Sequence, residues 1–160
     1  SACLNIFVFI TILAGKFLAN FGLVVFALAP TLVYYYSIYQ LGAPVGNLDS
    51  GAIIGSYIGL LFLAAAFVSI GMLASSLTKN QITAFIFGAF LCFFCHWAFM
   101  YIGRMTVFAT TLDVLIQKFG ISYHYTSISK GLIDTRDLVY FLSIITIFLY
   151  GTYISIKSHK

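Results

Sequence analysis

The chain has 160 residues, of which 62% are hydrophobic and only 8% carry a charge, and its mean hydropathy is +1.06. Soluble proteins carry about 25% charged residues, which makes a buried hairpin in a soluble protein the less favoured alternative. The net charge of +4 comes from scattered basic residues, without the patch that nucleic-acid binding needs. We therefore expect one membrane domain over residues 1–160, all-α and polytopic, because long apolar runs suit helices better than the alternating strands of a barrel.

The first fifty residues are expected to hold one span and one external loop. Residues 1–15 are apolar but short for a crossing and lead into Gly15-Lys16, so we expect 1–16 to be a cytoplasmic segment. The first span is predicted over 17–36, with Pro30 inside it, because about 20 apolar residues cross a bilayer. A cluster of tyrosines up to Tyr39 follows, as is typical of a membrane interface.

The middle of the chain predicts a hairpin of two spans, 51–77 and 82–103. Small residues open the first of these, with Gly51, Gly55 and Gly59 on one helix face, which predicts close packing against another helix. The turn between the spans is short, polar and positive through Lys79. It is therefore expected at the cytoplasmic face.

Residues 104–137 form the polar part of the chain and are expected on the external side of the membrane. Helical spacing over 111–119 predicts a short helix, either re-entrant or lying in the interface, and a second short turn is expected to end at Gly131. Asp134 is predicted to cap the last helix, with Asp137 near its positive dipole end. The last span is predicted over 138–156.

The lysines predict the orientation. One side of the four spans would carry four lysines and no acidic residue, whereas the other side would carry equal numbers of acidic and basic residues. The positive-inside rule places the lysine-bearing side in the cytoplasm, together with the C-terminus. The lysines concerned are Lys16, Lys79, Lys157 and Lys160.

Two places could carry chemistry. Cys92, Cys95 and His96 match the C-x-x-C-H pattern of covalent haem attachment, and helical spacing would also suit a soft metal. They lie within a charge-free span, where free cysteines pack as small hydrophobes, so we favour packing and expect no metal or cofactor. His124 could contact a substrate or lie at the interface beside its neighbouring tyrosines, and the second interpretation is favoured.

Several short motifs resemble the permease subunits of ABC-2 type transporters, most closely the gliding-motility-associated permeases (the GldF group). The resemblance covers about residues 15–157. The motifs are GKFLAN (15–20), PTLVYYY (30–36), GAPVGNLDSG (42–51), ASSLTKNQ (74–81), YTSISKG (125–131) and IDTRD (133–137). The second and third motifs point to the gliding subgroup.

The resemblance implies a six-span subunit of the cell inner membrane, of which spans three to six are expected here. It implies a re-entrant helical hairpin before the last span, a separate ABC ATPase subunit on the cytoplasmic side, and a second permease copy or a paralogous subunit. The chain has no phosphate loop, so ATP hydrolysis is expected in the partner. The alternative is a non-transporting membrane scaffold of a motility or secretion complex. Candidate contacts with the ATPase are Lys16, Ser75, Ser76, Thr78, Lys79 and Asn80.

Overall fold

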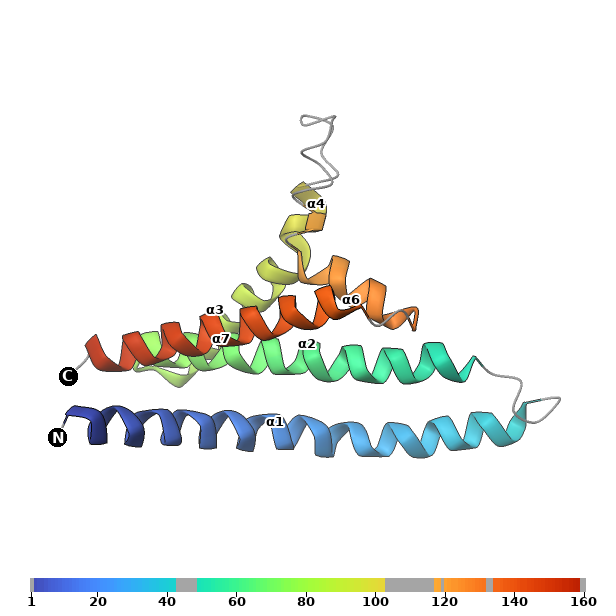
Figure 1. Cartoon of the computed structure of the whole chain (residues 1–160), viewed down its shortest axis with the longest axis horizontal. Coiled ribbons are helices and arrows are strands. Elements are labelled where there is room, and N and C mark those ends of the chain that lie inside the picture. The colour runs from blue at the N-terminus through green and yellow to red at the C-terminus, as the bar shows by residue number, and fades with distance from the viewer. Residues whose placement is uncertain (1, 43–48, 103–116, 119, 132–133, 159–160) are drawn as a thin grey trace.

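The computed structural model describes residues 2–42, 49–102, 117–118, 120–131 and 134–158, and these residues form helices and short turns without a strand (Figure 1). The α3, η1 and α4 segments follow one another directly, η1 being a π-helical turn within one long helix. The helices are α1 (Ala2–Leu41), α2 (Ser50–Leu77), α3 (Gln81–Phe93), η1 (Phe94–Ala98), α4 (Phe99–Ile102), α6 (Ile121–Ser129) and α7 (Thr135–Ser158).

Four helices of the described chain are long and apolar enough to cross a membrane. Their bounds are Ile10–Leu41, Ser50–Leu77, Gln81–Ile102 and Thr135–Ser158. The expectation of an all-helical chain with four candidate spans is therefore confirmed. The short helix predicted over 111–119 falls almost wholly outside the described residues.

The first helix is longer than the sequence predicted. Instead of a separate segment over 1–16 and a span over 17–36, α1 runs without a break from Ala2 to Leu41. Gly15 does not end it, because a glycine within a helix costs only about 1 kcal/mol relative to alanine. Pro30 also lies inside the helix. Directly after the proline, the Thr31 hydroxyl donates to the Leu28 carbonyl and accepts from the Tyr57 hydroxyl of α2 at 3.0 Å.

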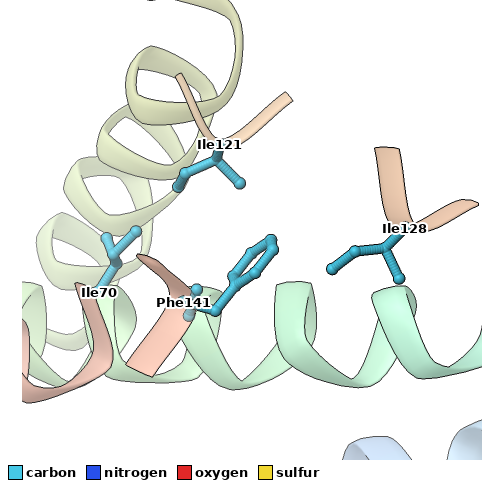
Figure 2. Close-up of a cluster of buried hydrophobic side chains, with 5 residues drawn as sticks. Ile70, Ile121, Ile128 and Phe141 are labelled. Carbon is cyan, nitrogen blue, oxygen red and sulfur yellow. The ribbon is translucent and has the colours of Figure 1, made fainter. Parts of the chain in front are cut away.

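Helix α2 lies at the centre of the bundle and contacts α1, α3, α6 and α7. In the most apolar stretch of α2, a third of the residues are buried inside the chain. In the corresponding stretch of α1, no residue is buried. Buried hydrophobic side chains from three helices meet in one cluster (Figure 2). This core holds Ala66 and Ile70 of α2, Ile121 and Ile128 of α6, and Phe141 of α7.

The predicted glycine face of α2 packs against α6, not against another full span. A Cβ added to Gly55 would lie 2.7 Å from the Cα of Gly131 and 2.7 Å from the Ile128 carbonyl oxygen, so only glycine permits this approach. Gly59 faces the Ile128 side chain, and Gly51 lies beside Gly131. Gly131 has φ +81°, which a glycine adopts without strain, and it turns the chain from α6 towards α7.

The two ends of the bundle differ in what they carry. Both chain termini lie at one end (Figure 1), which also holds the last turn of α2 and the Thr78–Asn80 turn into α3. We call this the lysine end, after Lys16, Lys79 and Lys157. At the opposite end, α6 folds over the first turns of α2 and α7, and we call this the α6 end.

Candidate functional site

A groove at the lysine end brings together three of the residues that the sequence singled out. Lys16 of α1 lies with Ser75 and Ser76 of α2 around a cavity of about 560 Å³. Asn20 of α1 and Thr152 of α7 add two further polar side chains. Polar groups from three helices therefore converge on one concave site, although Lys16 and Thr152 are more than 130 residues apart in sequence. Lys16 is exposed there.

The other predicted contact residues lie in the α2–α3 turn and do not line this groove. Asn80 caps α3 by accepting a hydrogen bond from the Ile82 backbone at 3.0 Å. The Thr78 hydroxyl lies 3.4 Å from the Ala74 carbonyl oxygen, and Lys79 is exposed. Thr78 and Asn80 therefore have structural roles at the two helix ends. Lys79 places an exposed positive charge at the tip of the hairpin.

The ends of α2 and α7 are joined beside the groove by a hydrogen bond. The Ser155 hydroxyl of α7 donates to the Ser76 carbonyl of α2 at 3.1 Å, and Ser155 is buried. This bond satisfies a carbonyl in the last turn of α2, where the helix itself provides no donor. The bond therefore holds together the two helix ends that line one side of the groove.

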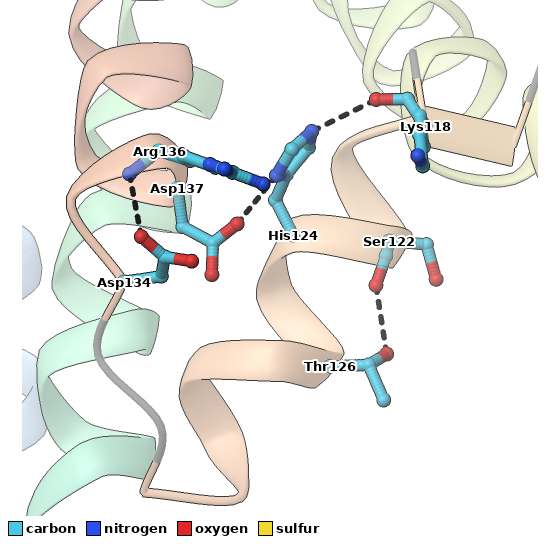
Figure 3. Close-up of polar contacts among 7 residues, drawn as sticks. All are labelled: Lys118, Ser122, His124, Thr126, Asp134, Arg136 and Asp137. Atoms are coloured by element: carbon cyan, nitrogen blue, oxygen red, sulfur yellow. Dashed lines mark hydrogen bonds and ion pairs between the residues drawn. The ribbon is translucent and has the colours of Figure 1, made fainter. Parts of the chain in front are cut away.

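The α6 end holds a buried pair that the sequence did not reveal. His124 Nδ1 of α6 lies 2.6 Å from Asp137 Oδ1 of α7, and His124 Nε2 lies 2.8 Å from the Lys118 carbonyl oxygen (Figure 3). The ring of Tyr140 stacks on the His124 ring with centroids 3.9 Å apart. Asp137 is 4% exposed, so this carboxyl is a buried partner of histidine and not only a favourable charge near the helix dipole.

The oxygens around His124 favour one proton shared between its ring and Asp137. A neutral imidazole has one N–H and one lone pair, but both ring nitrogens here face oxygen atoms. Either the ring carries both protons and Asp137 is ionised, or Asp137 is protonated and donates to Nδ1. In both arrangements the pair is neutral overall and holds one proton between Nδ1 and Oδ1, which suits burial.

Asp134 takes the capping position predicted for it. Its Oδ1 accepts a hydrogen bond from the Arg136 backbone at 3.1 Å, immediately before α7 begins (Figure 3). The second carboxylate oxygen of Asp137, Oδ2, is buried and has no hydrogen-bond partner within the described part of the chain. The Asp134 cap and the contact of Asp137 with His124 of α6 together hold the start of α7 in place.

The C-x-x-C-H stretch lies where α3 passes into the π-helical turn η1. Cys92 and Cys95 pack beside the hydrophobic core, and the His96 ring meets the edges of the Phe67 and Trp97 rings with centroids about 6 Å away. Among the described residues, no group of three or more histidine, cysteine or acidic side chains is placed to hold a metal ion. The haem and metal interpretations gain no support from these contacts.

Sequence reasoning missed the His124–Asp137 pair because its two members belong to different helices. They are separated by 13 residues and a chain reversal at Gly131, a spacing that no helical periodicity relates. The signal that could have found them is the combination of a histidine, a glycine suited to a left-handed turn and an acidic first turn in the next helix. Comparison of the chain with known protein families, curated proteins and solved structures gives no match.

Proposed function

We propose that this chain is a membrane-spanning permease subunit of an ABC-2 type transporter of the gliding-motility-associated group, moved by a separate ATPase subunit. The observation that carries the proposal is the placement of α6, a short helix folded back on α2 and followed at once by the last candidate span, α7. The resemblance in motif implies a helical hairpin at this position. A second permease copy or a paralogous subunit would complete the passage.

The lysine end is the surface on which an ATPase would act. A motor can shift a permease only through contacts that differ between its own states. Lys16, Ser75 and Lys79 lie on this end, and the positive-inside rule would place it in the cytoplasm of a cell with an inner membrane. An ion pair between an exposed lysine and an acidic residue of the ATPase would contribute only about 0–1 kcal/mol, so docking would need contacts with the helix ends as well.

Crosslinking to a co-expressed ABC ATPase subunit tests this function. Single cysteines are introduced at Lys16, Ser75 and Thr78 of a cysteine-free variant, with Thr126 on exposed α6 as the matched control. Crosslinks are expected at the first three positions and not at Thr126. An intact complex without a crosslink at the lysine end would contradict docking there and favour the scaffold function, as would purification without any ATPase.

The proposed orientation has its own test with a membrane-impermeant thiol reagent. A cysteine at Thr126 is expected to react when the reagent is applied outside intact cells, and cysteines at Ser75 and Ser158 only after the membrane is opened. All three residues are exposed in the chain, so protection would report the membrane and not burial. Labelling of Ser75→Cys from outside would overturn the orientation but not the permease function.

A further inference from the structure

We propose that the groove around Lys16 binds a membrane phospholipid with a net negative headgroup, whose phosphate contacts Lys16. This inference goes beyond the permease function and does not depend on an ATPase. It rests on three observations: the chemistry of the groove lining, the position of the acidic residues of the chain, and a second, apolar cavity that borders the groove.

The groove lining offers donors to an anion. Lys16 contributes an ammonium group, Asn20 an amide, and Ser75 a hydroxyl, while the remaining wall is largely aliphatic. Among the residues that the structure describes, no acidic one lines the cavity. A phosphate oxygen accepts hydrogen bonds from all three of these side chains, and a bond to the charged ammonium is stronger than one between neutral groups.

The described chain provides no counter-ion for Lys16. Asp49 precedes α2, and Asp134 and Asp137 stand at the start of α7, all at the α6 end. Helix α2 alone is about 42 Å long, at 1.5 Å per residue, and the groove lies at its other end. Lys16 lies in a helix that is apolar on both sides of it, a position where an ionisable group pairs with another group or reaches the interface. An anion from the membrane meets this need.

The neighbouring cavity fits the acyl part of a lipid. It has a volume of about 470 Å³, lies between α1 and α7, and shares Leu13 with the Lys16 groove. Its walls are apolar and aromatic, including Ile10, Leu149 and Tyr153. One lipid molecule can therefore place its phosphate at Lys16 and an acyl chain in the apolar cavity along α7. A free phosphate has no group that would fill this second cavity. This distinguishes a lipid from a soluble anion.

The helix ends around the groove make Lys16 indispensable to such binding. Helices α2 and α7 both approach their C-termini here, and the negative ends of their dipoles disfavour an anion. The lysine charge must outweigh that repulsion. Replacing Lys16 should therefore remove anion selectivity, and should not merely weaken a diffuse attraction.

Native mass spectrometry of the purified, delipidated full chain tests the proposal by titration with phosphatidylglycerol and phosphatidylcholine. Wild type is expected to prefer phosphatidylglycerol, and Lys16→Gln to bind it about tenfold more weakly, the loss expected for one charged hydrogen bond. Lys16→Arg should retain binding. Lys79→Gln, which removes the same charge from a site outside the groove, is the matched control and should behave as wild type.

The apolar arm is tested by Leu13→Trp, which fills the border of the two cavities, against Ile12→Trp, whose side chain is exposed and lines neither. Only the first should weaken phosphatidylglycerol binding. Equal loss in Lys16→Gln and Lys79→Gln, or no loss in Lys16→Gln, would overturn the site. Full competition by glycerol 3-phosphate would mean a soluble-anion site and would contradict the proposal. Because the titration contains no ATPase, its failure leaves the crosslinking test of the permease function untouched.

Discussion

The two ends of the bundle handle polar groups in opposite ways. At the α6 end, two polar contacts join separate elements within the chain: Asp137 meets His124, and the Ser56 hydroxyl donates to the Ser129 carbonyl at 3.0 Å. At the lysine end, Lys16 and Ser75 stand exposed around an open groove. Internal pairing makes the α6 end a structural anchor, whereas the groove at the lysine end leaves the Lys16 and Ser75 side chains accessible.

This contrast predicts that substitutions at the α6 end should affect stability most. Gly55→Leu is expected to show the largest effect, more than about 3 kcal/mol, because the new side chain meets backbone atoms of α6 that cannot move aside. The free energy of unfolding is measured in bicelles or mild detergent. Gly22→Leu is the matched control, since a Cβ there meets nothing within 4 Å. Equal stability of the two variants would show that α6 does not dock on α2.

The His124–Asp137 pair should come next in size. His124→Ala is expected to destabilise by about 2–3 kcal/mol, because it leaves a buried carboxyl without its partner. Asp137→Asn and the double variant complete a thermodynamic cycle. If the pair acts as one unit, the double variant should cost clearly less than the sum of the single ones. Additive losses would mean that the two residues contribute separately.

The smallest effect is expected at the lysine end. Ser155→Ala removes the hydrogen bond to the Ser76 carbonyl and should cost about 0.5–1 kcal/mol, in the range measured for hydrogen bonds between membrane helices. Ser143→Ala, whose hydroxyl bonds only within α7, should leave the free energy of unfolding unchanged. A loss as large as that of His124→Ala would show that the lysine end is also a structural anchor, contrary to the contrast drawn above.

Some features of the fold could be predicted from the sequence and others could not. The apolar runs located four candidate spans, and the acidic residues before the last of them predicted the Asp134 cap, because the hydropathy of a helix and the chemistry of its first turn are local properties. The glycine face of α2 was also visible as a pattern at Gly51, Gly55 and Gly59. The helix that packs against this glycine face could not be predicted, because a face of small residues can pack against many different helices.

The sequence alone determined that the chain is helical, is apolar enough for a membrane and carries four of its lysines apart from its acidic residues. Only the tertiary structure decided that α6 covers the glycine face, that His124 meets Asp137, and that Lys16 shares a groove with Ser75 and Thr152. It also made residues 2–41 one helix where a boundary at residue 16 was expected. The physical reason is the same in each case: composition and periodicity report the neighbours along the chain, whereas pairing and cavities depend on which helix faces meet across it.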